Sequence, residues 1–263
     1  MTTDRAATDG AATDGAATDR AATLRRLHVP GSPLILPNVW DAASARAVQE
    51  AGFPVVATGS AAVARVLGYA DGERTPVAEM MAAVARIAAA VDVPVTADVE
   101  RGYGLAPREL AERLAEAGAV GCNVEDSDPR TKELVDAGAQ ADFLAGLRAA
   151  AGADLVINAR VDTYVTGLRD RAAAVERGRR YLEAGADCVY PITLEDEDEI
   201  AALVTEVGGP VNILFRPKAP SYARLAELGV ARISFGGGLH QAVHAYAQGL
   251  FAAVRDGRDP YAG

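Results

Sequence analysis

Two apolar runs that end in acid decide the fold: Val93-Pro-Val-Thr-Ala-Asp98-Val-Glu100 and Gly121-Cys-Asn-Val-Glu125-Asp-Ser-Asp128. Each reads as a buried strand, and the carboxyl ends of neighbouring parallel strands lie at the same edge of a sheet. Asp98, Glu100 and Glu125 are then expected close together, where unpaired carboxylates raise each other's pKa by repulsion. A bound divalent cation removes that repulsion, and oxygen ligands of this kind suit Mg²⁺ or Mn²⁺. The two runs therefore predict a metal site held by these three acids.

Outward from these runs, short apolar strands alternate with alanine-rich amphipathic helices. The predicted strands cover residues 34–37, 55–58, 93–98, 120–125, 155–160, 188–191, 211–215 and 232–235. The predicted helices cover residues 42–51, 76–91, 107–117, 140–151, 169–184, 197–207, 221–228 and 241–254. Eight strand–helix units predict an α/β fold, a closed (β/α)8 TIM-type barrel. A doubly wound open sheet is the alternative, but no glycine fingerprint of the dinucleotide type follows the first strand.

The first 23 residues differ from the rest of the chain. They read MTTDR-AATDG-AATDG-AATDR-AAT, a five-residue repeat of small and polar side chains. Such a segment cannot bury enough apolar surface to offset the entropy lost on ordering. The sequence therefore predicts a disordered low-complexity tail over residues 1–23 and a single barrel domain over residues 24–263.

Composition narrows the class of protein. Of the 263 residues, 50% are hydrophobic, and the formal net charge is −10 with no basic stripe, which argues against a nucleic-acid partner. The two cysteines, Cys122 and Cys188, lie inside apolar runs, so a disulfide framework is not expected and a reducing compartment is. No signal peptide opens the chain, and no charge-free apolar run reaches the ~18 residues that a bilayer span needs. We expect a soluble cytoplasmic protein with no membrane partner.

Polar residues at the strand ends outline a candidate site, because in such a barrel the loops after the strands share one mouth. The predicted substrate-binding residues are Trp40, Asp41, Thr58, Gly59, Ser60, Ala61, Arg160, Asn212 and Arg216. The predicted catalytic residues are Arg160, Asp71 and Glu125. Acid gathers after the third and fourth strands, and cationic residues follow the fifth and seventh. This layout predicts a metal on one side of the mouth and a small anionic carboxylate beside it.

Several of these residues also have structural readings. Asp41 could simply cap the next helix, and Arg160 could be only an ion-pair partner for an acidic neighbour. Trp40 reads as a wall of the pocket or as core filler, and Asp162 as an orienting or capping residue. Cys122 and Cys188 read as inert core residues, and the three histidines do not form a metal cluster.

At this point the motifs resemble a known group, the isocitrate lyase/phosphoenolpyruvate mutase superfamily. The resemblance is carried by Pro37-Asn-Val-Trp-Asp41, Thr58-Gly-Ser60, Gly68-Tyr-Ala-Asp71-Gly, Asp98-Val-Glu100-Arg-Gly-Tyr-Gly104, Asn123-Val-Glu125-Asp126 and Asn158-Ala-Arg160-Val-Asp162. It implies an α/β barrel whose last helix is often exchanged between subunits of a homodimer or homotetramer. It also implies cleavage or formation of a C–C or P–C bond next to a 2-oxo acid, through a pyruvate-like enolate.

The same resemblance implies roles for individual residues. Mg²⁺ would bind near Asp98, with Glu100 and Glu125 helping directly or through water and Asp71 close by. Backbone N–H groups of Ser60 and its neighbours would hold the substrate carboxylate. Arg160 would contact the substrate near the reacting bond.

One departure from the superfamily pattern matters for the reaction. Isocitrate and methylisocitrate lyases carry a Lys-Lys-Cys-Gly-His loop after strand four, whereas this chain reads Asp126-Ser-Asp-Pro-Arg130-Thr-Lys132. With the acidic cysteine missing, Tyr103, Asp128 and Lys132 are the candidate proton donors. We therefore expect a Mg²⁺-dependent lyase cleaving a C–C bond of a small 2-oxo or 2-hydroxy acid. The alternatives are P–C chemistry, by a phosphonomutase or phosphonopyruvate hydrolase, and a non-catalytic carboxylate-binding barrel.

Overall fold

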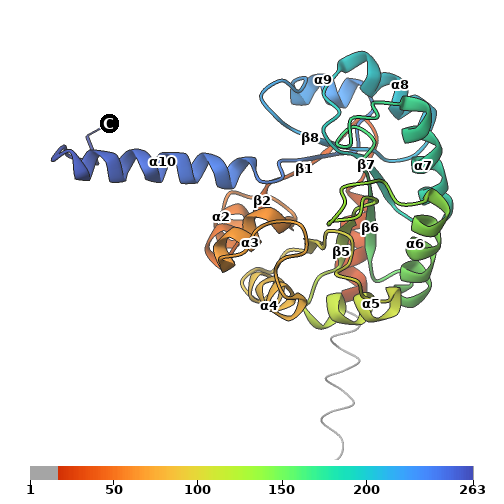
Figure 1. Ribbon diagram of the computed structural model, residues 1–263, viewed down its shortest axis with the longest axis horizontal. Helices are drawn as coiled ribbons and strands as arrows, with labels where there is room; N and C mark the ends of the chain where they lie inside the picture. Colours follow the sequence, from red (N-terminus) through yellow and green to blue (C-terminus); the bar gives the residue numbers. More distant parts are fainter. Residues whose placement is uncertain (1–16, 263) are drawn as a thin grey trace, which may run out of the picture.

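The computed structural model describes residues 17–262, and its strands form a parallel barrel surrounded by helices (Figure 1). The strands are β1 (Leu34–Leu36), β2 (Asn38–Val39), β3 (Val56–Thr58), β4 (Val95–Asp98), β5 (Gly121–Val124), β6 (Val156–Val161), β7 (Cys188–Pro191), β8 (Asn212–Leu214) and β9 (Arg232–Ser234). The helices are α2 (Ala42–Glu50), α3 (Ser60–Leu67), α4 (Val77–Ala88), α5 (Pro107–Glu116), α6 (Ala137–Ala151), α7 (Arg171–Glu183), α8 (Glu197–Val207), α9 (Tyr222–Glu227) and α10 (Gly238–Arg255).

The strand order closes the sheet. β2 to β7 pair in sequence, and β8 pairs with β9, which pairs with β1. β1 and β2 are one strand interrupted at Pro37, which has no N–H to donate. A parallel bridge between Val189 and Val211 joins β7 to the start of β8. The predicted (β/α)8 barrel is confirmed.

Burial on both faces explains why the strands read as unbroken apolar runs. Val124 on β5 and Ile157 on β6 are fully buried, as are Leu114 on α5 and Leu144 on α6, which pack in the same cluster. Several helices begin at a capping acid: the side chain of Asp196, for example, accepts a hydrogen bond from the backbone N–H of Glu199. The apolar runs and the capping acids together set where each strand ends and the next helix begins. The polar residues of the site lie in these short connections.

The amino-terminal end of the barrel is covered by a helix over residues 17–26. Its Ala21 and Leu24 are fully buried against Leu34, Val55 and neighbouring strand residues. Gly121 makes room for this helix, because a Cβ there would lie 2.7 Å from Cδ2 of Leu24. The predicted tail boundary at residue 23 is therefore wrong for residues 17–23, whose small side chains are ordered by tertiary burial that a local reading does not reveal. Residues 1–16 lie outside the described residues.

His28 follows this helix and gives the fold an acid-sensitive point. Its Nδ1 lies 2.8 Å from the carbonyl oxygen of Leu24, and burial, followed by the nearby charge of Arg232, lowers its pKa from 6.5 to about 4. A depressed histidine pKa means that the unfolded chain takes up this proton first, so stability is lost as the pH falls from 6.5 towards 4. The loss should reach roughly 3 kcal/mol. Urea unfolding across this range should show a shallower pH dependence in His28→Gln, whose amide can still donate to Leu24; parallel curves would contradict the assignment.

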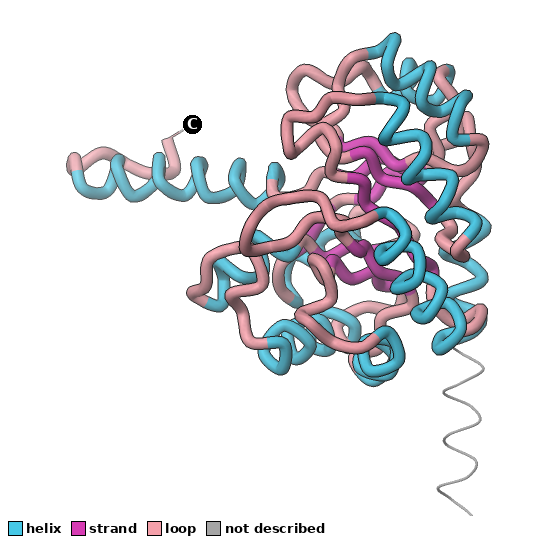
Figure 2. The backbone as a smooth tube through the Cα atoms, turned by 45° about the vertical axis from the view of Figure 1, so that its right-hand side comes forward, coloured by secondary structure: helices cyan, strands magenta, loops and turns pink. Residues whose placement is uncertain are grey.

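The last helix extends away from the barrel (Figures 1 and 2). Large apolar side chains on α10 are exposed: Val243, Tyr246, Phe251 and Val254. Within residues 17–262, no helix is both long enough and apolar enough to cross a membrane.

Candidate active site

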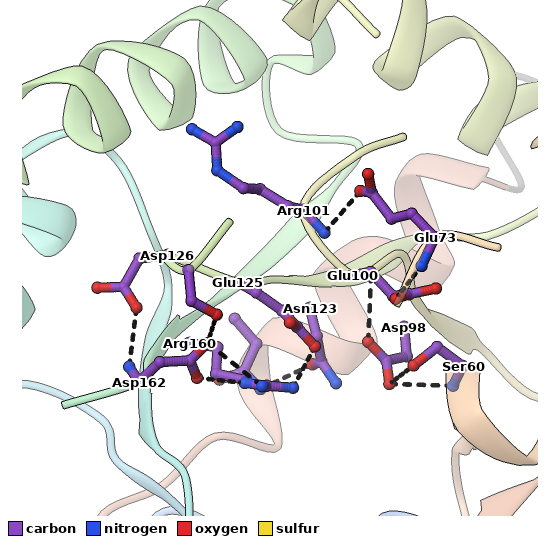
Figure 3. Close-up of polar contacts among 12 residues, drawn as sticks. Ser60, Glu73, Asp98, Glu100, Arg101, Asn123, Glu125, Asp126, Arg160 and Asp162 are labelled. Carbon is purple, nitrogen blue, oxygen red and sulfur yellow. Dashed lines mark hydrogen bonds and ion pairs between the residues drawn. The ribbon is translucent and has the colours of Figure 1, made fainter. Parts of the chain in front are cut away.

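A cavity of about 350 Å³ opens at the carboxyl ends of the strands. It brings together seven of the predicted site residues: Ser60, Ala61, Asp71, Asp98, Glu100, Glu125 and Arg160. Figure 3 shows several of their contacts. These seven residues come from the ends of β3 to β6 and from the segment after α3, at the end of the barrel where the strand-end loops of such a fold meet.

Asp98, the last residue of β4, is held by the end of the neighbouring strand. Its Oδ2 accepts hydrogen bonds from the backbone N–H of Ser60, at 3.0 Å, and from the Ser60 hydroxyl, at 2.8 Å. Its own N–H donates to Oγ1 of Thr58 at 2.9 Å. Ser60 and Thr58 therefore orient Asp98 here, and the Ser60 N–H that was expected to hold the substrate carboxylate is used by Asp98 instead.

Glu100 is pinned by the loop that follows α3. Its Oε2 accepts from the backbone N–H of Glu73 at 2.6 Å, and its Oε1 accepts from the Tyr103 hydroxyl at 2.9 Å. Burial, with the nearby charges of Asp98 and Asp71 adding to it, raises the pKa of Glu100 to about 7, while the bond from Tyr103 opposes the shift. Three carboxylates, those of Asp71, Asp98 and Glu100, thus repel one another on this side of the cavity.

Glu73 locks two loops together, a role that was not predicted. Its Oε1 accepts from the backbone N–H groups of Tyr103, at 2.6 Å, and Arg101, at 3.1 Å. Glu73, Glu100 and Tyr103 all have φ near +50 to +57°, the left-handed region that side chains other than glycine rarely adopt. Strained backbone of this kind is found mostly at active sites, where the surrounding contacts hold it in place.

Arg160 on β6 is gripped from two sides. One Nη pairs with Oε1 of Glu125, and the Nε donates to Oδ1 of Asp162 at 2.5 Å. Burial opposes the charge of Arg160, but Glu125 and Asp162 outweigh it and hold its pKa above the ordinary value. Burial likewise raises the pKa of Glu125, and Arg160 limits that rise. Because a guanidinium keeps its proton, Arg160 is a permanent cation in the site.

A buried network supports Asp162 from behind. The backbone N–H of Asp162 donates to Oδ1 of Asp126 at 2.8 Å, and Oδ2 of Asp126 accepts from the Tyr181 hydroxyl at 2.7 Å and from Arg177 at 3.0 Å. The predicted orienting role of Asp162 agrees with these contacts, because the carboxylate fixes Arg160 without lining the cavity itself.

The other predicted substrate-binding residues lie outside the cavity lining. Asp41 is the N-cap of α2 and bonds Ser44, which confirms its structural reading. Trp40 packs edge-on against His240, with ring centroids 4.9 Å apart. Thr58 accepts the hydrogen bond from the Asp98 N–H, and Gly59 is the N-cap residue of α3. Asn212 is fully buried below the cavity, and Arg216 is exposed and pairs with Glu195 at 3.5 Å, so neither position supports the predicted substrate contact.

Further lining residues were not predicted as site residues. Oδ1 of Asn38 accepts from the backbone N–H groups of Phe235 and Gly236, both at 2.8 Å, and its Nδ2 donates to the Thr58 carbonyl. Asn38 thereby ties three strand-end loops together. Tyr190 and Ser234 complete the floor at the ends of β7 and β9. The sequence signal that could have identified these residues is their position at strand ends. Uncharged side chains at such positions are common in any barrel, so they do not by themselves indicate a site.

The acids of the cavity stand apart from one another. Among residues 17–262 no group of three or more acidic, histidine or cysteine side chains is gathered closely enough to enclose a metal ion. Asp98, Glu100 and Glu125 nevertheless face one cavity, and Glu100 and Glu125 keep raised pKa values partly through repulsion by Asp98. Mg²⁺ usually retains several waters and takes only one or two carboxylates directly. The residues therefore fit an ion held by Asp98, with the other acids reached through water.

Comparison with known proteins identifies the family. The sequence profile of phosphoenolpyruvate phosphomutase matches residues 24–255, so the chain belongs to this family. A candidate phosphonomutase of known structure from Burkholderia cenocepacia J2315 is 44% identical, with a TM-score of 0.82 over 88% of this chain and 98% of that one. A candidate lyase or mutase from the same strain is 36% identical, with a TM-score of 0.85 over 92% and 90%. An uncharacterized Mycobacterium tuberculosis protein is 36% identical over 88% of this chain and 86% of its own.

More distant members of the family differ in reaction. They include an oxaloacetate decarboxylase of Pseudomonas fluorescens, 28% identical, a 2,3-dimethylmalate lyase of known structure, 28% identical, and a phosphonopyruvate hydrolase, 26% identical, whose structure contains oxalate and Mg²⁺. The superfamily therefore contains lyases, mutases and hydrolases that act on small carboxylates, and a divalent metal is a cofactor within it.

Proposed function

We propose that this protein is a Mg²⁺-dependent lyase that cleaves a C–C bond of a small 2-oxo or 2-hydroxy carboxylic acid through a pyruvate-like enolate. The observation that supports it is the convergence of Asp71, Asp98, Glu100, Glu125 and Arg160 on one cavity of about 350 Å³. That volume suits a compact substrate. Relatives named as an oxaloacetate decarboxylase and a 2,3-dimethylmalate lyase support the same class.

Each residue has a distinct task in this proposal. Asp98 would hold the ion, and Glu100, Glu125 and Asp71 would help to hold it from the same side of the cavity. The bound metal supplies Lewis-acid stabilisation of negative charge on the 2-oxo acid. Arg160, fixed by Glu125 and Asp162, neutralises charge that develops at the reacting bond. Ala61, in the first turn of α3, offers a backbone N–H without an intrahelical acceptor to the substrate carboxylate.

Lys132 is the proton donor in this proposal. Of the three candidates, it alone lines the cavity. Tyr103 already donates to Glu100, and Asp128 binds the backbone N–H groups of Arg130 and Thr131. The Lys132 ammonium lies beside Gly72, where an added Cβ would be 3.2 Å from Nζ. Lys132→Met should therefore reduce kcat much more than it reduces oxalate affinity, and an unchanged kcat would remove Lys132 from the reaction.

One substrate panel tests the proposal. The purified protein with Mg²⁺ is offered oxaloacetate, substituted malates, isocitrate analogues and phosphonopyruvate, and 2-oxo acid release is followed together with phosphorus NMR. We expect release of a 2-oxo acid from a phosphorus-free substrate. A migrating or released phosphorus signal would instead establish P–C chemistry, the alternative favoured by the 44% identical candidate phosphonomutase. Metal-dependent oxalate binding without turnover of any compound would leave only a binding barrel.

We also propose that α10 joins two copies of this chain in a homodimer or homotetramer. Tyr246 is 72% exposed and Phe251 69% exposed on a helix that leaves the barrel. Large apolar side chains exposed together mark an association surface. The wild type should sediment as an oligomer, and Tyr246→Glu with Phe251→Glu should sediment as a monomer. The control Leu168→Glu, at an exposed apolar residue between β6 and α7, should leave the oligomer intact. A monomeric wild type would contradict the proposal.

A further inference from the structure

The barrel interior contains a charged residue that neither the fold nor the proposed chemistry uses. Arg232 on β9 is 0% exposed and is among the largest fully buried side chains. Its Nη2 donates to Oδ1 of Asn123 at 3.2 Å, whereas its Nε and Nη1 have no hydrogen-bond partner. Within residues 17–262, no carboxylate forms an ion pair with it. A buried unpaired cation is costly, so its presence needs a compensating negative charge.

Arg232 lies one side chain below the floor of the active-site cavity. Asn123, its hydrogen-bond partner, lines that cavity, and Asn158 also donates to the same Asn123 oxygen, at 2.7 Å. Ser234, two residues further along β9, lines the cavity too, and its hydroxyl donates to Asn212, the register partner of Arg232 on β8. Asn123 and Ser234 thus separate the guanidinium from the space where a ligand would lie.

The charges around the cavity show what this cation can do. Four carboxylates line it, those of Asp71, Asp98, Glu100 and Glu125, against two cations, Lys132 and Arg160. Arg160 is already paired with Glu125 and Asp162. Before a metal is bound, an anion that enters meets a predominantly negative lining, and a divalent cation only offsets that excess. Among the described residues, neither Lys132 nor Arg232 forms an ion pair with a carboxylate, and of these two Arg232 is the fully buried one, so its field acts through a weakly screening interior.

We infer that Arg232 is a specificity-determining residue whose positive charge, acting from beneath the floor, makes the cavity select doubly charged carboxylates over singly charged ones. It is a positioning residue, because it acts on a ligand through Asn123 and through its field rather than by contact. This inference rests on the proposed function in one respect: it takes the cavity as the carboxylate site. It adds the ligand class, a dianion such as a dicarboxylate or an ionised enolate.

The test compares two small probes, oxalate and pyruvate, with Mg²⁺ and without turnover. Arg232→Met keeps an unbranched side chain, though a shorter one, and removes the charge, and apolar replacement of a buried ion is often tolerated. By calorimetry, oxalate affinity should fall roughly tenfold or more, and pyruvate affinity by less than about threefold. Arg232→Lys should restore most of the preference. Arg216→Met, which removes an exposed arginine outside the cavity, should leave both affinities unchanged.

Each outcome bears on the inference. An equal loss for both probes would leave the preference for oxalate unchanged, assign Arg232 a purely structural role and overturn the inference while the proposed function stands. Unchanged affinities for both probes would overturn it in the same way. If wild-type protein binds neither probe with Mg²⁺, both fail together. Arg232→Gln, which keeps a donor for Asn123, is measured in the same way if the methionine variant does not fold.

Discussion

Replacing Asp98 with asparagine should abolish divalent-metal binding and turnover together. Asparagine keeps the acceptor that Ser60 bonds, at 2.8 Å and 3.0 Å, so the end of β4 should remain in place. It removes the charge of the one acid that we place directly on the metal, and Glu100 and Glu125 are committed to Glu73, Tyr103 and Arg160. Loss of Lewis-acid stabilisation should lower kcat by roughly a thousandfold or more.

The measurements are Mn²⁺ titration by calorimetry or electron paramagnetic resonance, and initial rates with chelated and metal-replete protein. Asp128→Asn is the matched control, because Asp128 follows the neighbouring strand β5 but does not line the cavity. It should bind metal and turn over normally. Wild-type rates in Asp98→Asn under strict chelation would rule out the metal mechanism.

Arg160→Gln should cost roughly a hundred- to a thousandfold in kcat, because it removes a preorganised positive charge from the reacting centre. It should also destabilise the fold, since the buried carboxylates of Glu125 and Asp162 lose their ion-pair partner. Breaking a buried pair from one side typically costs about 3–5 kcal/mol. Chemical denaturation and steady-state kinetics on the same preparation measure the two effects separately.

A double variant separates chemistry from stability. Arg160→Gln combined with Glu125→Gln removes both charges of the closest ion pair, so much of the stability should return while activity stays low. Arg216→Gln, at an exposed arginine, should change neither quantity. Recovery of activity in the double variant would show that Arg160 serves only as an ion-pair partner.

The barrel could be predicted from sequence because its signals are local. Runs such as the one ending at Asp98 are apolar throughout, as strands buried on both faces must be, and acids such as Asp196 mark helix starts. Parallel topology then placed Asp98, Glu100, Glu125 and Arg160 at one mouth, and they do line one cavity. The residue types and the strand ends were sufficient for this part of the site.

The site residues that were predicted wrongly or missed depend on two features that a sequence does not show. These are the depth of a residue in the barrel and the conformation of the loops. β8 ends at Leu214, so Asn212 lies below the cavity and Arg216 beyond its rim, which a strand boundary uncertain by two residues cannot distinguish. The links from Glu73 to Tyr103 and from Ser60 to Asp98 join separate loops across 30 and 38 positions. Such contacts depend on how whole loops meet. The burial of Ala21 likewise depends on the shape of the barrel end that it covers.

The helix over residues 17–26 has a practical consequence for anyone shortening this chain. The five-residue repeat ends at residue 23, so the sequence alone suggests expressing the protein from residue 24. Such a truncated polypeptide would lack most of the helix that covers this end of the barrel. Apolar residues at the starts of β1, β3 and β6 would be exposed to water, and the Arg25–Asp187 ion pair at 2.7 Å would lose the helix that positions Arg25. A truncated variant should therefore retain residue 17 onward, because the helix that covers this end of the barrel begins there.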